Sequence, residues 1–167
     1  MRILNGEEER WAIEYLEFAI KIAKHAKCTR SKCGAVIITS CGTLIGRGFN
    51  SPPGDLESQR RCTCEKSSYH PKVVDKTCCV HAEQRAVMDA LGRNPDALLG
   101  STMYFARLDM NDELKYSGAP YCTMCSKMVL DVGIKHFVLW YKQGVTVFDT
   151  EEYNNLSYQY DGTKHFA

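Results

Sequence analysis

The sequence lacks the long apolar runs that place a protein in a membrane. No segment approaches the roughly 18 consecutive apolar residues that a membrane-spanning helix requires. The first residues, MRILNGEEERW, also lack the apolar stretch of a secretory signal peptide. We therefore expect a cytoplasmic protein with no membrane partner.

A strong excess of charge of one sign is also missing. The chain has 21 Lys and Arg against 20 Asp and Glu, which gives a formal net charge of +1. Domains that follow a nucleic-acid backbone are usually strongly basic, so the composition argues against a nucleic-acid partner and favours a small-molecule substrate. The segment from Lys27 to Lys76 is locally basic, with nine basic and four acidic residues. Its loop cations are candidates for a substrate phosphate, although such cations are often only solvated: Arg60, Arg61, Lys66, Lys72 and Lys76.

Cysteine, in contrast, is abundant. Nine cysteines are an odd number, and in a chain without an export signal they argue against a disulfide framework and for metal binding. The 167 residues, 44% of them hydrophobic, suffice to bury one core. We expect a single domain over residues 1–167.

Hydrophobic periodicity predicts an amphipathic first helix. Asn5 can cap it, with Glu8 at the capping-box position. Large apolar side chains then recur at helical spacing: Trp11, Tyr15, Phe18, Ile22 and Ala26. The apolar segments 33–39 (CGAVIIT) and 43–49 (TLIGRGF) predict a β-hairpin. A long polar loop follows from residue 50 to residue 77, and loops of this length are usually functional or clamped by a metal.

Helices and strands alternate in the remainder. The pattern predicts helices over 80–91 and 122–132, which end at Gly92 and Gly133, and strands over 101–107 and 135–141. A tight hairpin joins the last strand to a further one, and the aromatic tail (YNNLSYQY) is expected to pack within the chain or against a second subunit. This order predicts an α/β fold, with a mixed five-stranded sheet whose middle strands are parallel and buried beneath helices.

Two short motifs combine the residue types of a catalytic metal site. Cys122 and Cys125 are three residues apart at the start of a helix, so both sulfurs project from one face, near a helix dipole that stabilises thiolates. His81 and Glu83 stand at the start of the preceding helix. They are separated by about 200° around a regular helix, and converge only if the metal lies beyond its N-terminus. Both helices follow strands, so their N-termini open onto the same edge of the sheet.

One imidazole and two thiolates give Zn²⁺ three protein ligands and leave a fourth position for water, which is typical of a catalytic site. Zinc lowers the pKa of bound water towards ~7. Glu83, beside the metal but not bound to it, can then transfer protons between water, substrate and leaving group. A structural zinc site or a redox-active C-x-x-C motif is the alternative interpretation.

The combination of HAE (residues 81–83) with PYCTMC (residues 120–125) resembles the signature of zinc-dependent deaminases. From its first helix to its last strand the chain is similar to the cytidine deaminase superfamily. This resemblance implies a three-layer α/β/α fold, His81, Cys122 and Cys125 as zinc ligands, and Glu83 as the proton shuttle. The implied reaction is hydrolysis of the exocyclic amine of a cytosine nucleoside or nucleotide, with release of ammonia.

The resemblance leaves the substrate open. The segments SKCGAVII and GRGFNSPPG resemble deoxycytidylate deaminases, which implies that Asn50 contacts the sugar, although Asn50 could simply form a turn. The tight hairpin in VLWYKQGVTVFD instead resembles the free-nucleoside enzymes. Ala82, Pro120 and Tyr121 are further candidates for the substrate pocket; Tyr121 separates Pro120 from Cys122, which the family usually keeps adjacent. Deoxycytidylate is the first substrate hypothesis. The alternatives are a free nucleoside, another base, a polynucleotide, or an inactive zinc-bearing interaction module.

The remaining cysteines leave room for a second, structural zinc. Its candidate ligands lie in and after the long loop, and some deoxycytidylate deaminases have a zinc in this region: Cys62, Cys64, His70, and Cys78 or Cys79. The alternative is that these cysteines are small apolar fillers, as we expect for Cys28, Cys33 and Cys41 in the core or in turns. We also expect a homo-oligomer.

Overall fold

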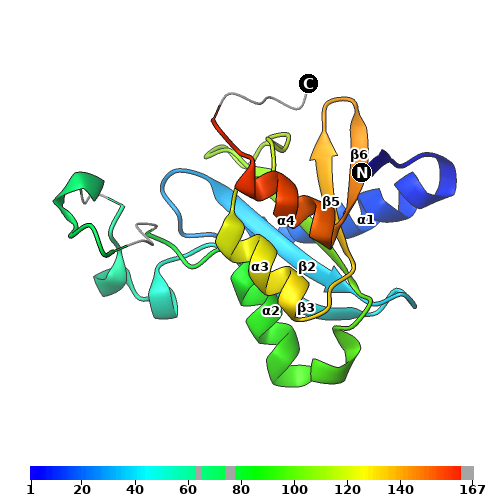
Figure 1. Ribbon diagram of the computed structural model, residues 1–167, viewed down its shortest axis with the longest axis horizontal. Helices are drawn as coiled ribbons and strands as arrows, with labels where there is room; N and C mark the ends of the chain where they lie inside the picture. The colour runs from blue at the N-terminus through cyan, green and yellow to red at the C-terminus, as the bar shows by residue number, and fades with distance from the viewer. Residues whose placement is uncertain (63–64, 74–77, 163–167) are drawn as a thin grey trace.

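A six-stranded sheet lies between two layers of helices in the computed structural model, which describes residues 1–62, 65–73 and 78–162. The strand order is β1-β6-β5-β4-β2-β3. Helix α1 covers one face, and α2, α3 and α4 cover the other (Figure 1). The expected three-layer α/β/α fold is therefore confirmed.

The strands are β1 (Arg2–Ile3), β2 (Lys32–Ile38), β3 (Leu44–Phe49), β4 (Thr102–Leu108), β5 (His136–Tyr141) and β6 (Gly144–Asp149). The helices are α1 (Gly6–Ala23), α2 (Ala82–Arg93), α3 (Thr123–Asp131) and α4 (Thr150–Tyr158). Four short 3₁₀ helices complete the described elements: η1 (Pro53–Asp55), η2 (Glu57–Gln59), η3 (Lys66–Ser68) and η4 (Pro95–Ala97). The sheet has one strand more than expected, because the two-residue β1 pairs with the edge strand β6.

The sheet contains one parallel pair, β4 with β5, while β2 and β4 are antiparallel. The expected parallel pairing is therefore found between β4 and β5, but β2, which lies between β4 and β3, is antiparallel to both. The chain leaves β3, passes through α2 and returns as β4 on the far side of β2, so β4 runs in the direction of β3 and opposite to β2. The carboxyl ends of β3 and β4 consequently lie at the same end of the sheet.

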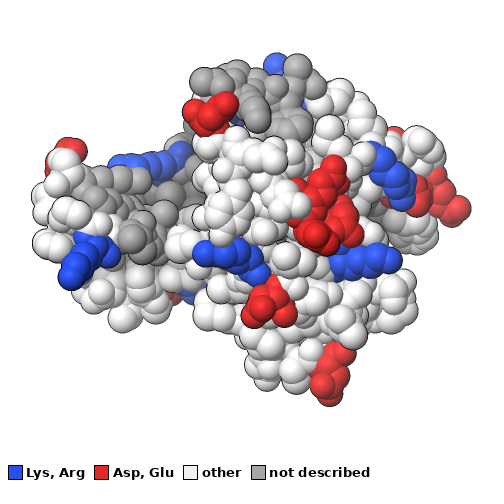
Figure 2. Space-filling model, in the orientation of Figure 1, with Lys and Arg blue, Asp and Glu red and all other residues white. Residues whose placement is uncertain are grey.

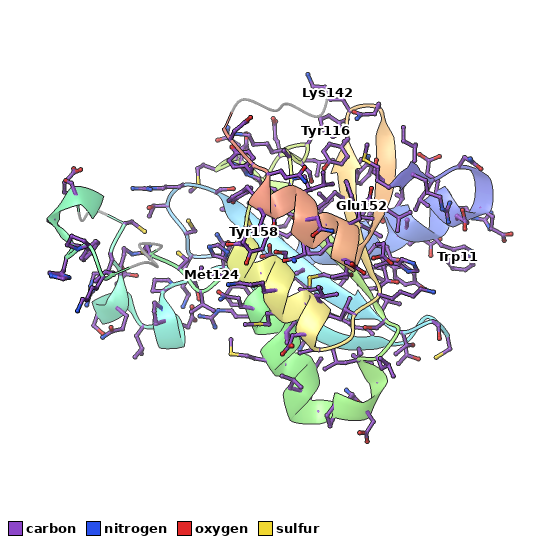
Figure 3. The ribbon with its side chains drawn as sticks, in the orientation of Figure 1. Trp11, Tyr116, Met124, Lys142, Glu152 and Tyr158 are labelled. Carbon is purple, nitrogen blue, oxygen red and sulfur yellow. The ribbon has the colours of Figure 1, made fainter. Side chains whose placement is uncertain are left out.

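The buried face of α1 differs from the expected one. Its core residues are Ala12, Leu16, Ala19 and Ala23, while Trp11 is 48% exposed and points away from the sheet (Figure 3). The reason is a close approach between helix and sheet. A Cβ added at Gly34 of β2 would lie 2.1 Å from the Ala19 carbonyl oxygen, so only small side chains fit between α1 and β2.

The N-terminus of α1 also differs from the capping-box expectation. Asn5 does occupy the N-cap position, but its side chain makes no capping hydrogen bond. Glu8 instead pairs with Arg2 at 2.6 Å, which occupies its carboxylate. This ion pair connects the strand β1 to the first turn of α1.

The aromatic tail forms most of a helix, α4, that the sequence did not predict. Asp149 caps this helix, because its side chain accepts a hydrogen bond from the Glu151 backbone N–H at 2.9 Å. Tyr153 stacks on Phe137, with ring centroids 4.1 Å apart and ring planes 5° apart. The packing expected of the tail is thus realised within the chain, against β5 and α3.

None of the described helices is long and apolar enough to cross a bilayer.

On the face of the molecule shown in Figure 2, basic and acidic side chains are interspersed. One ion pair connects the two ends of the described chain, because the amino group of Met1 contacts the carboxylate of Glu152 in α4.

Helix α2 packs on β3 through residues that have little or no side chain. A Cβ added at Gly48 would lie 2.3 Å from the Ala82 carbonyl oxygen and 2.4 Å from the Ala86 backbone nitrogen. Gly46 makes the same kind of approach to Ala86 and Ala90. The first turn of α2, which carries the chemistry described below, is therefore held directly against the end of β3.

We predict that Gly48→Ala lowers the free energy of unfolding by about 2 kcal/mol or more, because the added methyl group overlaps backbone atoms of α2. Gly92→Ala is the matched control. Gly92 lies in α2 with no atom near its added Cβ, so alanine there is expected to raise the free energy of unfolding by up to ~1 kcal/mol. Urea unfolding of both variants measures the difference, and equal effects would contradict the packing argument.

Candidate functional site

His81 stands immediately before α2, outside the helix. Its backbone is extended, with φ −72° and ψ 156°, and its N–H donates to the Gln84 side-chain oxygen at 2.9 Å. The angle of about 200° expected for two helical residues therefore does not apply to His81 and Glu83. The extended backbone at the N-cap allows both side chains to face the cavity at the end of the sheet, which both residues line.

Cys122 and Cys125 occupy the equivalent position at the start of α3. Cys122 is the N-cap residue, and its sulfur accepts a hydrogen bond from the Cys125 backbone N–H. The Cys122 sulfur lies 3.3 Å from Nδ1 of His81, and the Cys125 sulfur lies 3.1 Å from the same atom. Segments that are about forty residues apart in the sequence thus meet, as the motifs predicted.

The two sulfurs lie 3.1 Å apart and share a hydrogen bond. This hydrogen bond lowers the pKa of Cys122 to about 4, and His81 contributes in the same direction. The same hydrogen bond, together with burial, raises the pKa of Cys125.

Glu83 is buried, with 7% of its surface exposed, in the first turn of α2. Burial raises the pKa of its carboxyl group, while the nearby His81 acts in the opposite direction. A hydrogen bond from the Cys125 thiol also reaches this carboxylate. Glu83 thus touches the cluster of candidate ligands.

The donor set fits zinc. His81, Cys122 and Cys125 each offer one ligand atom, and these atoms all lie within 4.8 Å of one another. One nitrogen and two sulfurs are the donors that zinc prefers, and three protein ligands leave a position for water. A divalent cation would also offset the negative charge that these thiolates and Glu83 concentrate in a buried space.

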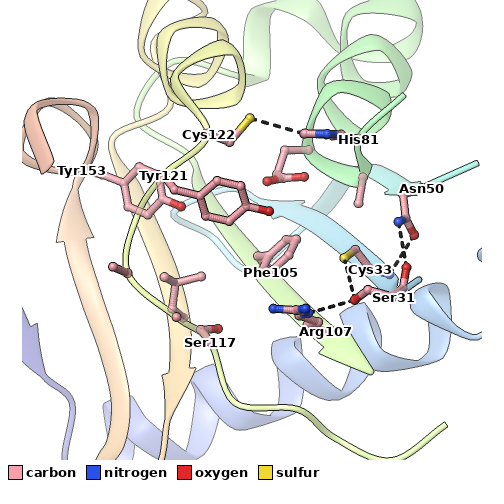
Figure 4. Close-up of a pocket in the computed structure, with 15 residues that line it drawn as sticks. Ser31, Cys33, Asn50, His81, Phe105, Arg107, Ser117, Tyr121, Cys122 and Tyr153 are labelled. Carbon is pink, nitrogen blue, oxygen red and sulfur yellow. Dashed lines mark hydrogen bonds between the residues drawn. The ribbon is translucent and has the colours of Figure 1, made fainter. Parts of the chain in front are cut away.

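This cluster forms one end of a cavity with about 740 Å³ of empty space, part of it open to solvent (Figure 4). Phe105 and Leu139 contribute apolar surface from the sheet, and Tyr153 contributes from α4. The tail residue Tyr153 was not predicted to reach the site, because a helix after β6 was not predicted.

Asn50 lines the cavity and is buried. Its side-chain oxygen accepts from the Cys33 N–H at 2.8 Å, and its side-chain nitrogen donates to the Ser31 carbonyl at 2.9 Å. These bonds join the end of β3 to the start of β2, so Asn50 is more than a turn former beside Pro52. One lone pair and one N–H of the amide remain available to a ligand.

The other predicted pocket residues have different positions. Ala82 and Tyr121 line the cavity, and Tyr121 is 60% exposed at its edge, with its ring 5.6 Å from that of Tyr160. Pro120 is buried and does not line the cavity. The preceding residues 117–119 line it instead.

Arg107 was missed by sequence reasoning. It is the only Lys or Arg among the described residues that line the cavity. The loop cations that were expected there point elsewhere: Arg60 pairs with Glu57, and the Arg61 side chain donates to the Ser58 and Arg60 carbonyls. Lys72 does not line the cavity, and the side chains of Lys66 and Lys76 lie outside the described residues. Strand alternation could have identified Arg107, because it shares a sheet face with Met103 and Phe105.

A second cysteine cluster lies at the base of the long loop. The sulfurs of Cys62, Cys78 and Cys79 all lie within 4.8 Å of one another, and Cys28 is hydrogen-bonded to Cys79. Cys28 was expected to be only a core or turn residue. His70 is not among the residues whose ligand atoms converge there, and its Nδ1 accepts from the Lys72 N–H; Cys64 lies outside the described residues.

Curated relatives of this chain are deoxycytidylate deaminases. Identity is 26% over 131 residues to the Schizosaccharomyces pombe protein, 27% over 134 residues to that of Mycobacterium phage D29, and 26% over 133 residues to the human protein. The matches cover 77% of this chain, and 36%, 92% and 63% of those relatives respectively. The chain thus spans only part of the fission yeast and human proteins.

The fold is similar to that of the deoxycytidylate deaminase of cyanophage S-TIM5, solved in complex with dCMP and dUMP. The TM-score is 0.53 at 22% identity, over 80% of this chain and 82% of that one. Residues 9–141 match the family described as the cytidine and deoxycytidylate deaminase zinc-binding region. That match includes His81, Glu83, Cys122 and Cys125, and with it the chain belongs to the cytidine and deoxycytidylate deaminase zinc-binding family.

Proposed function

We propose that the protein hydrolyses the exocyclic amine of a cytosine nucleotide or nucleoside, with deoxycytidylate as the first candidate substrate. The observation that carries this proposal is the buried Glu83 carboxylate beside the convergent His81, Cys122 and Cys125 ligand atoms, in one cavity. The names of the relatives support the substrate class.

In this proposal His81, Cys122 and Cys125 hold zinc, which supplies the Lewis acidity that makes water a nucleophile at neutral pH. Glu83 takes a proton from the attacking water and delivers it to the ring nitrogen beside the amino-bearing carbon. Once the water oxygen has bonded to that carbon, Glu83 takes the second proton from the new hydroxyl group and transfers it to the amine, so that the C–N bond breaks, a carbonyl forms and ammonia leaves. A buried carboxyl group with a raised pKa is suited to hold a proton between these transfers.

Other residues orient the base and the sugar. The first N–H groups of a helix have no partner within it, so the Ala82 N–H at the start of α2 can donate to a substrate carbonyl. Phe105 supplies an aromatic surface on which a base can lie, and Asn50 offers its remaining amide groups to the sugar.

Two alternatives remain from the sequence. A free nucleoside is favoured by the tight hairpin between β5 and β6, in which Tyr141 pairs with Gly144. An inactive zinc-bearing module has no need for a buried carboxylate at a metal, because burial of an ionisable group costs free energy. Glu83 therefore favours catalysis.

We also propose that residues 1–167 form one domain and that the chain self-associates. The exposed Trp11 and Phe18 on α1 offer an apolar surface for such an interface.

The substitution Glu83→Gln tests the proton-transfer role of this residue. Glutamine preserves the shape of the side chain but cannot carry a proton, so kcat for the best cytosine substrate is expected to fall at least a thousandfold. Zinc content and the melting temperature are expected to remain close to those of the wild type. Ammonia release measures turnover, and near-normal turnover on every active substrate would refute the proposed role of Glu83.

A further prediction separates metal binding from proton transfer. Cys122→Ala or Cys125→Ala removes one of three protein ligands, so the variant is expected to lose the zinc at this site. Cys41→Ala, at an exposed cysteine in the turn between β2 and β3, is the matched control and should retain the zinc. Metal analysis of dialysed proteins gives the stoichiometry. A full equivalent of zinc in the site after either ligand is removed would refute the assignment.

We further propose a structural zinc held by the second cysteine cluster. Cys62, Cys78 and Cys79 provide three convergent sulfurs, and Cys28, next to Cys79, is the candidate fourth. Such a site would fasten the loop after β3 to the segment that enters α2.

This proposal predicts about two zinc equivalents per chain. Cys78→Ser should lower the content towards one while deamination persists in the remaining folded protein. Cys41→Ser is again the control and should leave two equivalents. A wild-type stoichiometry of one, with Cys62 and Cys78 reacting freely with thiol reagents, would reject the second zinc.

A further inference from the structure

The cavity is chemically different at its two ends. His81 and Cys122 lie at one end, Arg107 and Ser31 lie at the other, and Phe105 lies between them (Figure 4). Ser117 also lines the cavity near the second end. One end is therefore built for a metal, and the opposite end gathers a guanidinium and two hydroxyl groups.

The backbone of β4 sets the position of Arg107. Phe105 and Arg107 are two residues apart on one strand, so their side chains project from the same face of the sheet about 7 Å apart along it. Arg107 pairs in register with Cys33 of β2, which also lines the cavity. A molecule that lies on Phe105 with its reacting end towards His81 would therefore extend towards Arg107.

Arg107 is held in place by a neutral partner. Its Nε donates to the Ser31 hydroxyl oxygen at 2.8 Å, which fixes one edge of the guanidinium. Among the described residues, no carboxylate forms an ion pair with Arg107. Its two terminal nitrogens thus keep the planar, paired donors that bind a phosphate through two hydrogen bonds.

We infer that Arg107, positioned by Ser31, binds the 5′-phosphate of the substrate and makes the enzyme select nucleoside monophosphates over nucleosides. This assignment rests on the proposed function and identifies the group that the far end of the cavity recognises. It replaces the expectation that loop cations bind the phosphate, because Arg60 and Arg61 are engaged outside the cavity.

The test compares kcat/KM for deoxycytidylate and deoxycytidine in the wild type, Arg107→Gln, Arg107→Lys and Arg61→Gln. The wild type is expected to prefer deoxycytidylate at least tenfold. Arg107→Gln should reduce kcat/KM for deoxycytidylate about a hundredfold, mainly through KM, and by a factor at least ten times larger than for deoxycytidine. For Arg107→Lys, kcat/KM for deoxycytidylate should lie between those of the wild type and Arg107→Gln, because lysine keeps the charge but loses the paired donors.

Arg61→Gln is the matched control, since it removes an exposed loop cation that does not line the cavity. It is expected to keep the wild-type preference. A binding measurement that needs no turnover supplements the kinetics: Arg107→Gln should weaken calorimetric binding of the product deoxyuridylate far more than that of deoxyuridine. Melting temperatures identify any variant that does not fold, in which case Arg107→Lys carries the test.

The outcomes distinguish this inference from the proposed function. If Arg107→Gln lowers kcat/KM by the same factor for both substrates, and so leaves the preference for deoxycytidylate unchanged, the role of Arg107 is overturned while deamination stands. If Arg61→Gln alone loses the preference, the phosphate binds at the loop, and the role of Arg107 is again overturned. If the wild type deaminates neither substrate although zinc is bound, the proposed function itself fails.

Discussion

The contact between α2 and β3 is the constraint on which the site depends. Gly46 and Gly48 allow the backbone of α2 to approach β3 directly. This contact places the start of α2 at the carboxyl end of β3, and α3 starts beyond the carboxyl end of β4, which runs in the same direction. A larger side chain at Gly48 would push the first turn of α2 away and separate His81 from the two cysteines of α3.

Electrostatics explains why this convergence requires a cation. Cys122, Cys125 and Glu83 can each carry a negative charge, and they lie in contact in a largely buried space. Burial raises the pKa of Glu83, and the hydrogen bond with Cys122 together with burial raises that of Cys125, so negative charge on these groups costs free energy here. The helix dipoles of α2 and α3 offset only part of this charge. A divalent ion in the site would allow both cysteines to be thiolates while Glu83 remains free to exchange protons.

The sequence predicted what depends on local spacing and missed what depends on distant contacts. The ligands of the candidate zinc site follow from two short motifs, and the order of helices and strands follows from periodicity. The buried face of α1 was wrong because Gly34, in another element, decides which side of the helix can approach the sheet. Helix α4 was missed because its burial depends on Phe137, and β1 was missed because two residues carry no periodic signal. The cysteine cluster was anticipated only in part, since Cys28 joins it from before β2.

Arg107 shows the same limit at the level of a single side chain. In the sequence it is the last residue of the expected strand over 101–107, and no motif singles it out. In the fold it is half-buried beside Ser31, with no carboxylate among the described residues to pair with it. Partial burial of an unpaired guanidinium costs free energy, and among the described residues no carboxylate offsets that cost in an ion pair. An anionic ligand at this position would supply the opposite charge. The free-energy cost of partly burying the unpaired guanidinium is therefore the physical reason to place the phosphate there.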